Sequence, residues 1–167
     1  YSDYQIDQSM RFDRYADTGL TRTQTTGSSR RTYTHSLWLK IFNNDYNGVA
    51  MMIFAAAVTS STNKLDNWNF NTGGGTGVAI QAIGFNGGTS GSVQTNGVHR
   101  DYTGWGHYVL AVDTTQSTAA DRVRFYRNGS QLSTTGTQPD QNEDLNINNN
   151  IGHAVGTLWR GSNRGGE

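Results

Sequence analysis

WGHYVLAVDTTQSTAADRVRFYRNGSQL, residues 105–132, contains two short runs rich in Val, Phe and Tyr, which suit a pleated and half-buried sheet surface. The small polar loop TTQSTAA separates the two runs, and Asn128-Gly129 closes the second. Asn-Gly is the strongest short-range signal for a hairpin, because a type I′ turn needs a positive φ at both central residues. The stretch therefore predicts three successive antiparallel strands.

The rest of the chain repeats this pattern of short apolar runs between turn residues. Of its 167 residues 21 are glycines, only one is a proline, and Thr, Ser and Asn are abundant. Further strands are expected at residues 9–12, 19–23, 33–42, 49–58, 68–71, 78–85, 93–98, 144–148 and 151–159, with turns or polar loops at residues 25–31, 43–48, 60–67, 72–77, 86–92 and 149–150. Such regular short strands, with no long helix, predict one all-β domain over residues 1–167, an antiparallel two-sheet sandwich or jelly roll.

The run YTHSLWLKIF, residues 33–42, alternates like a long strand with one buried face. That face would carry Tyr33, His35, Leu37, Leu39 and Ile41. Trp38 and Lys40 would face the other way. Only one face of each sheet meets the core of a sandwich, so Trp38 is either partly exposed or covered by a loop.

Composition excludes several classes of protein. Lys plus Arg equals Asp plus Glu at 13 each, so no net field attracts nucleic acid or an anionic membrane. Cysteine is absent, which rules out a disulfide framework and a thiolate metal site. The longest apolar stretch, residues 49–58, is too short to span a membrane and reads as a buried strand.

The central stretch resembles the middle hairpin of laminin-G-like, concanavalin A-like jelly rolls, in which a Trp-x-His strand runs to an acidic residue and a second strand ends in Tyr-x-Asn-Gly. The matching positions are Trp105, His107, Asp113, Tyr126, Asn128 and Gly129. The fuller form RDYTGWGHYVLAVDTTQSTAADRVRFYRNG is similar to versions in structural proteins of bacteriophage particles, particularly marine ones. MRFDRYADTGLTRT, RRTYTHSLWLK, QPDQNEDLNIN and IGHAVG extend the resemblance over roughly residues 5–156.

The resemblance implies a non-enzymatic virion component of a tailed phage, such as a capsid decoration or a tail or head fibre domain. Its partners would be other virion proteins, further copies of the chain, and glycans on the host surface. The family adds a strand after the region matching residues 161–166, beside the N-terminal strand, so an open edge is expected to be occupied in the assembly. Two alternatives stay open, a secreted or cell-surface carbohydrate-binding module and a fragment of a glycanase.

No catalytic constellation is visible. Glycosidases need two carboxylates at a fixed separation, but the only glutamates are Glu143 and Glu167, and Glu143 and Asp144 would point to opposite faces of a strand. A Gly-x-Ser-x-Gly elbow is missing. The segment TGGGTG, residues 72–77, lacks the Lys-Ser/Thr of a phosphate loop and reads as a turn.

Polar residues of the central stretch receive structural roles. The four histidines lie on separate predicted strands, and His107 is expected to pack beside Trp105 with a ring nitrogen bonded to the backbone. Asp113 and the pair Asp121-Arg122 frame the loop, where we expect the carboxylates to accept from loop amides and Arg122 to bridge back. Arg127 departs from the apolar residue usual in the family. It shares a face with Val123 and Phe125, so either the core ends before Arg127 or Arg127 meets a carboxylate.

Ligand sites are only weakly indicated. The oxygen-rich segments at residues 43–45 and 140–144 could supply a calcium ion at the rim, but ordinary Asx turns explain them and no spacing marks a metal loop. No metal or cofactor is therefore predicted. Glycan stacking needs an exposed aromatic ring, and the aromatics near predicted turns are Trp68, Trp159, Tyr46 and Tyr102, each of which could instead belong to the core or rim.

Overall fold

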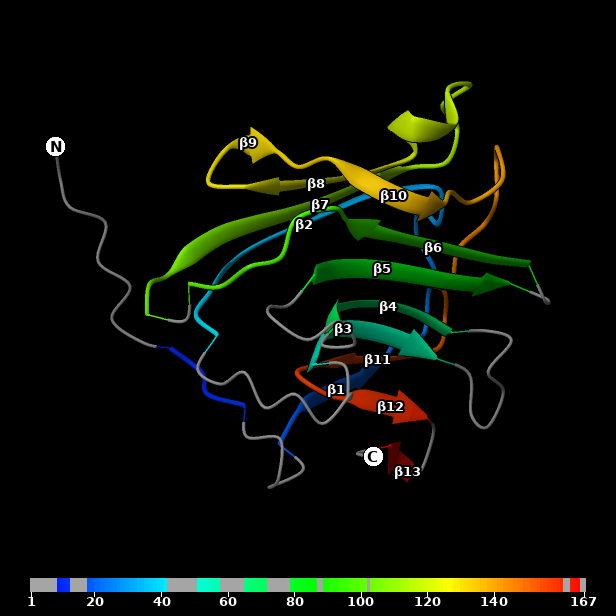
Figure 1. The fold of residues 1–167 in the computed structure, drawn as a ribbon. Coiled ribbons are helices and arrows are strands. Elements are labelled where there is room, and N and C mark those ends of the chain that lie inside the picture. Colours follow the sequence, from blue (N-terminus) through cyan, green and yellow to red (C-terminus); the bar gives the residue numbers. More distant parts are fainter. Residues whose placement is uncertain are drawn as a thin grey trace, which may run out of the picture.

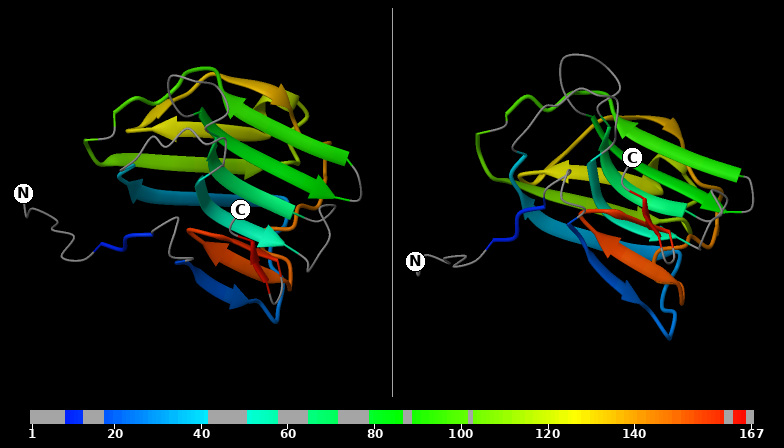
Figure 2. Two further views of the ribbon diagram at one scale, coloured as in Figure 1. Left: turned by 60° about the horizontal axis from the view of Figure 1, so that its bottom comes forward. Right: turned by 90° about the horizontal axis from the view of Figure 1, so that it is seen from below.

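The structure, a computed structural model, describes residues 9–12, 18–41, 51–57, 65–71, 79–86, 89–101, 103–160 and 163–165. Two antiparallel sheets lie face to face (Figure 1 and Figure 2). One has seven strands in the order β1 (Leu20–Thr23), β11 (Gly152–Val155), β3 (Met51–Ala57), β4 (Leu65–Asn71), β5 (Ala79–Asn86), β6 (Thr89–Thr95) and β10 (Thr134–Thr137). The other has β2 (Thr32–Leu39), β7 (Gly106–Asp113), β8 (Val123–Arg127) and β9 (Ser130–Gln131), while β12 (Leu158–Arg160) and β13 (Asn163–Gly165) form a separate pair. The predicted all-β sandwich is confirmed.

The central hairpin is also confirmed. Strands β7, β8 and β9 follow one another and pair antiparallel. Asn128 and Gly129 have φ values of 49° and 82°, the two positive angles that a type I′ turn requires. The backbone N–H of Asn128 donates to the carbonyl of His107 at 2.8 Å, and the side-chain oxygen of Asn128 accepts the N–H of His107 at 2.9 Å. The turn thereby holds the end of β8 against the start of β7.

The core lies between the two sheets. Every second residue of β7 is buried, and the inward side chains of β2 pack against the same cluster. Each sheet supplies several large apolar residues, which are Tyr108, Leu110, Val112, Val123 and Phe125 from the four-stranded sheet and Trp68, Phe70, Ile80 and Val93 from the seven-stranded sheet. The predicted alternation of residues 33–39 is therefore confirmed, and it fixes which side chains of β2 point outward.

Two predicted strands are wrong. Residues 9–12 and residues 144–148 contain no strand, although Leu145 and Ile147 are buried. In the second segment Arg30 satisfies backbone carbonyls that a neighbouring strand would otherwise bind, donating to Leu145 at 2.6 Å and to Asp144 at 3.1 Å. This side-chain interaction lets the segment bury its apolar residues without joining a sheet.

Strands β4 and β6 begin earlier than expected. The predicted loop at residues 60–67 gives way to β4 from Leu65, and the predicted turn at residues 86–92 is shorter than expected, because β5 and β6 pair as far as Asn86 and Thr89. Strand β6 pairs with β5 and β10. At Gly91 the backbone lies close to Pro139, since an added Cβ would be 3.1 Å from the nitrogen of Pro139.

The predicted strand at residues 151–159 is interrupted. Gly156 has a φ of 76°, and the chain leaves β11 there before it forms β12. An added Cβ at Gly156 would lie 2.3 Å from Cδ1 of Phe12, so only glycine fits this bend. Strand β1 is the outermost strand of the seven-stranded sheet, and β11 is its partner within the described part of the chain. The further strand expected after residue 167 stays a prediction.

Candidate ligand-binding face

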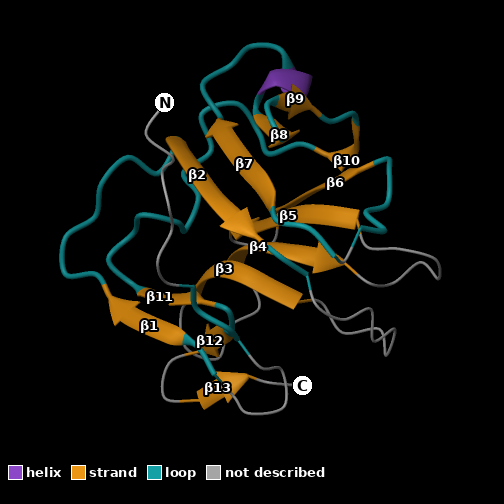
Figure 3. Ribbon diagram, turned by 90° about the vertical axis from the view of Figure 1, so that its left-hand side faces the viewer, coloured by secondary structure: helices purple, strands orange, loops and turns teal. Residues whose placement is uncertain are grey.

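The side chains of the four-stranded sheet that alternate with the core residues point away from the other sheet and form one surface, which we call the outer aromatic face (Figure 3 shows β2 and β7 side by side). This face comprises Thr34, Ser36 and Trp38 of β2, His107, Val109 and Ala111 of β7, Arg124 and Tyr126 of β8, and Gln131 of β9. Because all nine lie on paired strands, the backbone fixes their positions.

Trp38 is the most exposed aromatic residue of this face, with 53% of its surface open to solvent. It pairs across the strands with His107, and the two ring centroids lie 5.3 Å apart at an interplanar angle of 37°. Of the two alternatives that the sequence left open, partial exposure is the correct one. The indole therefore has the His107 ring as a neighbour and retains open surface.

His107 is held by a side chain of the adjacent strand. Its Nε2 atom lies 2.8 Å from the hydroxyl oxygen of Ser36, and the predicted bond from a ring nitrogen to the backbone stays a prediction. The ring neighbour observed is Trp38 across the strand pair, where Trp105 was expected. The reason is the outward orientation of His107, which places its ring above β2. The result is a compact group of an indole, an imidazole and a hydroxyl at one end of the face.

The loop before β7 borders this end of the face. Trp105 is 51% exposed and lies two residues before His107.

Asp101, in the same loop, accepts the backbone N–H of Thr103 at 3.0 Å and the hydroxyl of Thr103 at 2.9 Å, and these bonds lower the pKa of the Asp101 carboxyl group. A guanidinium nitrogen of Arg127 lies 3.8 Å from Asp101, and the guanidinium sits 5.8 Å from the ring centre of Tyr108. Arg127 thus meets a carboxylate, one of the two predicted alternatives.

The loop at the other end of β7 is rigidly braced. Asp113 accepts the hydroxyl of Thr115 at 2.6 Å and the side-chain amide of Gln116 at 2.6 Å, which lowers the pKa of Asp113. Arg122 donates to the carbonyls of Gln116, Ser117 and Pro139 at 2.9, 3.2 and 2.9 Å. Asp121 ends a short 3-10 helix, Ala119–Asp121, within the same loop. The bracing roles predicted for Asp113 and Arg122 are confirmed.

Of the four aromatics proposed from the sequence for stacking on a sugar, Trp68 is the one whose side chain lies in the described part of the structure. Trp68 is 0% exposed and stacks 6.1 Å from His35 between the sheets, so its ring has no surface for a ligand. Tyr46 and Tyr102 lie outside the described residues, as does the side chain of Trp159, whose backbone belongs to β12. Sequence reasoning did not select Trp38 as a candidate for ligand binding, although its outward position in an alternating strand was a usable signal.

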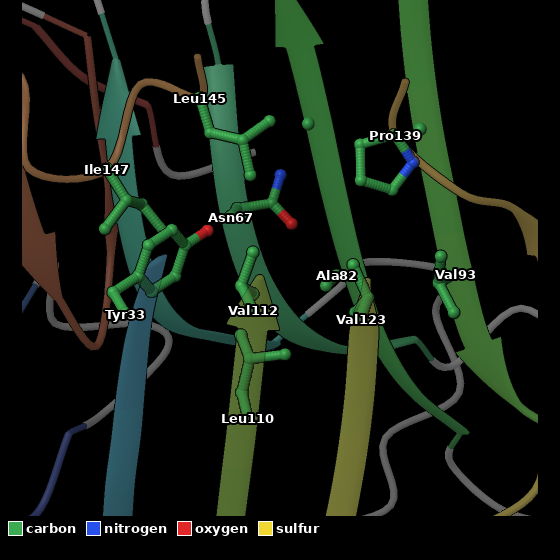
Figure 4. A pocket seen from close by; sticks show the side chains of 12 residues that line it. Tyr33, Asn67, Ala82, Val93, Leu110, Val112, Val123, Pro139, Leu145 and Ile147 are labelled. Carbon is green, nitrogen blue, oxygen red and sulfur yellow. The ribbon is translucent and has the colours of Figure 1, made fainter. Parts of the chain in front are cut away.

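A cavity of about 20 Å³ lies between the sheets (Figure 4). Tyr33, Val112 and Val123 line it from one sheet, and Ala82 and Val93 line it from the other. This volume accommodates about one water molecule, so a sugar does not fit into this cavity.

The oxygen-rich segment at residues 140–144 is engaged in its own turn. The carboxylate of Glu143 accepts the N–H of Asp140 at 2.9 Å, and burial raises the pKa of Glu143. Asp144 forms an ion pair with Arg31 at 2.7 Å. Within the described ranges no group of three or more His, Asp or Glu side chains could hold a metal ion, and no helix is long and apolar enough to cross a membrane. The other oxygen-rich segment, residues 43–45, lies outside these ranges.

Comparisons with known proteins identify the fold. No protein-family model matches the chain, and no curated protein matches it. The chain is similar to a solved structure, the native heptameric SAP-like pentraxin from Limulus polyphemus, with a TM-score of 0.57 and 14% identity over 87% of this chain. It spans 61% of the length of that pentraxin chain. The similarity supports the concanavalin A-like β-sandwich implied by the sequence resemblance, and at this identity it concerns the fold alone.

Proposed function

We propose that this chain is a non-catalytic carbohydrate-binding domain whose ligand lies on the outer aromatic face. The observation that carries the proposal is the group of Trp38, His107 and Ser36, with an open indole next to an imidazole and a hydroxyl. A pyranose presents an apolar C–H face together with a ring of hydroxyl groups. An indole covers the apolar face, and serine and histidine exchange hydrogen bonds with the hydroxyls.

Preorganisation strengthens this assignment. Trp38 and His107 sit at paired positions of two strands, and the contact between Ser36 and His107 links the same strands a second time. Ligand binding therefore has little side-chain and backbone freedom to remove, which lowers the cost of association. A loop-borne tryptophan would have to be ordered by the ligand itself.

The carboxylates near the face support binding without catalysis. Asp101 and Asp113 flank opposite ends of β7, and each is occupied by hydrogen bonds from its own loop. Retaining and inverting glycosidases place two carboxyl groups about 5 to 10 Å apart around the scissile bond. Strand β7 rises about 3.3 Å per residue over eight residues, so these two aspartates are too far apart for that role.

Replacement of Trp38 by Ala is expected to weaken glycan binding about ten-fold or more, because an aromatic anchor typically contributes at least about 1.4 kcal/mol to a binding site. The measurement is a glycan array with the intact chain, followed by calorimetry on the sugars that bind. Trp38→Phe should retain part of the affinity, and EDTA should leave it unchanged, since we propose binding without a metal.

Met10→Ala serves as the control, since Met10 is an exposed apolar residue outside the sheets. Equal affinity of the intact chain and Trp38→Ala would move the site elsewhere. No binding to any glycan on the array would refute the carbohydrate-binding function.

We propose, second, that the chain is a structural component of a virion, as a capsid decoration or fibre domain. The phage resemblance is the main support for this proposal. The alternative location is extracellular. The observation that favours an assembled state is strand β1, whose four side chains are all exposed at the edge of the seven-stranded sheet. Leu20 on this strand is 48% exposed. Edge strands with free backbone groups readily pair with another chain.

Light scattering after size-exclusion chromatography is expected to show an oligomer. Leu20→Lys should shift the population toward the monomer, because a charge on an edge strand opposes pairing. Val98→Lys, at another exposed apolar position, should not change it. A stable monomer at all concentrations tested would argue against self-assembly through β1. Association unaffected by Leu20→Lys would place the interface elsewhere.

A further inference from the structure

We infer that the ligand of the outer aromatic face is an extended, neutral oligosaccharide that crosses the strands from Trp38 to Tyr126. This inference rests on the proposed carbohydrate-binding function and specifies its ligand. The relevant features are a second aromatic ring on the face, a low surface between the two rings, and a balanced charge.

The register of the sheet sets the separation between the two rings. Ser36, Val109, Tyr126 and Gln131 form one row across the four strands, and Trp38 lies two residues from Ser36 on β2. Two strand spacings of about 4.8 Å and one two-residue step of about 6.7 Å place the Cα atoms of Trp38 and Tyr126 about 12 Å apart. At this separation an extended chain of several sugars can lie across both side chains.

Strand β7 provides the surface between the two rings. Val109 lies between Ser36 and Tyr126 in the row, and the neighbouring outward position of β7, toward Trp38, is His107. Val109 is too short to block a ligand that lies flat on the sheet, and the ring of His107 packs beside that of Trp38. Ser36 and Gln131 end the row with a hydroxyl and an amide. The row therefore combines the apolar side chain of Val109 with polar groups that can bind sugar hydroxyls.

The charges on this surface favour a neutral ligand. Arg124 is the cation of the outer aromatic face, and Asp113 lies two residues beyond Ala111, the partner of Arg124. The carboxylate of Asp113 accepts hydrogen bonds from Thr115 and Gln116 and also experiences the positive charge of Arg124. The two opposite charges offset each other at the same end of the face. An acidic sugar would therefore gain little at this end of the surface.

The test measures affinity against chain length with two neutral probe series, β-1,4-linked and α-1,4-linked glucose oligomers of one to six units, and with a hexamer of galacturonic acid as the acidic probe. For at least one neutral series we expect affinity to rise at least about ten-fold between one and four units and then to level off. The acidic hexamer should bind more weakly than the neutral hexamer of that series.

Three variants separate this inference from the proposed function. Tyr126→Ala should abolish the gain with chain length, whereas Trp38→Ala should weaken binding at every length. Tyr126→Phe, which keeps the ring, should retain the gain. Equal affinity for short and long oligomers, an unaffected Tyr126→Ala variant, or no binding of either series would overturn the inference. A glycan array signal that still depends on Trp38 would in each case leave the proposed function intact.

Discussion

Acidification from pH 7 to pH 4 is expected to destabilise the folded protein by about 3 kcal/mol through His35 alone. His35 points from β2 into the core, with its ring 4.5 Å from that of Phe54 and 6.1 Å from that of Trp68. Its Nδ1 atom is buried and has no hydrogen-bond partner among the described residues. Burial, and to a lesser extent the charge of His153, lowers the pKa of His35 from 6.5 to about 4.

Two other buried histidines act in the same direction. Nδ1 of His153 donates to the carbonyl of Ile151 at 2.9 Å, so Nε2 is the atom that accepts the N–H of Asn148 at 3.1 Å. Protonation of Nε2 would turn this acceptor into a donor that faces another donor. Burial lowers the pKa of His153, with a smaller contribution from Arg22. Burial followed by the charge of Arg127 lowers the pKa of His99 to about 4.

The sign of the effect follows from proton binding. Between pH 6.5 and pH 4 the unfolded chain carries a proton on His35 that the folded protein lacks. The free energy of unfolding therefore falls as the pH decreases through this window, and it stops falling through this group below about pH 4. A difference between 6.5 and about 4 corresponds to about 3 kcal/mol, since one pKa unit is worth about 1.4 kcal/mol.

Urea denaturation at several pH values between 7.5 and 4 measures this dependence. His35→Phe should reduce the slope of the unfolding free energy with pH by up to about one proton, because the variant has no group to titrate at this position. His107→Phe is the matched control, since His107 lies on the outer aromatic face. Identical slopes for the intact chain and His35→Phe would show that His35 is not responsible.

Replacement of Trp68 by Ala is expected to cost about 4 kcal/mol of unfolding free energy, a typical value for the loss of a large aromatic side chain from a core. Trp68 is the largest fully buried side chain of the described residues and lies opposite Phe54 across β3 and β4. Its removal leaves a cavity beside His35 that neighbouring strands cannot close without changing their spacing.

Trp38→Ala is the matched control, since it removes the same kind of side chain from the outer face of the four-stranded sheet. A change at an exposed strand position usually alters stability by less than about 1 kcal/mol. Chemical denaturation should therefore rank the variants with Trp68→Ala least stable, Trp68→Phe intermediate, and Trp38→Ala close to the intact chain. The reverse order for the two alanine variants would contradict the described orientation of β2 and β4.

Local chemistry explains the parts of the fold that the sequence predicted. Asn128-Gly129 encodes its own turn, because both residues tolerate positive φ and the side chain of Asn128 bonds back to β7. The alternation of β2 likewise reports which side chains are buried. Each of these signals is contained in a few consecutive residues.

Predictions failed where distant contacts decide the structure. Gly91 resembles a turn residue, but it belongs to a strand in which Pro139 packs close to the backbone. The segment at residues 144–148 resembles a strand, but Arg30 binds its carbonyls instead. Neither Pro139 nor Arg30 is close in sequence to the residues it affects, so a local pattern could not reveal these contacts.

The candidate site was only partly predictable for the same reason. Outward exposure of Trp38 was one of two expected alternatives, because it follows from the alternation of a single strand. The contact between Ser36 and His107 depends on the register between β2 and β7, and a shift of one residue would turn these side chains to opposite faces. The sequence contains both strands but does not state their register.

The pairing of β2 with β7 also affects how quickly the protein can fold. Ser36 and His107 are 71 positions apart in the chain, and Arg30 and Leu145 are 115 apart. Strands β3, β4, β5 and β6, by contrast, pair with their successive neighbours. The consecutive strands can form a meander early, whereas the four-stranded sheet must wait for a long loop to close. The outer aromatic face is therefore assembled late, and a nascent chain acquires it only after β7 has emerged from the ribosome.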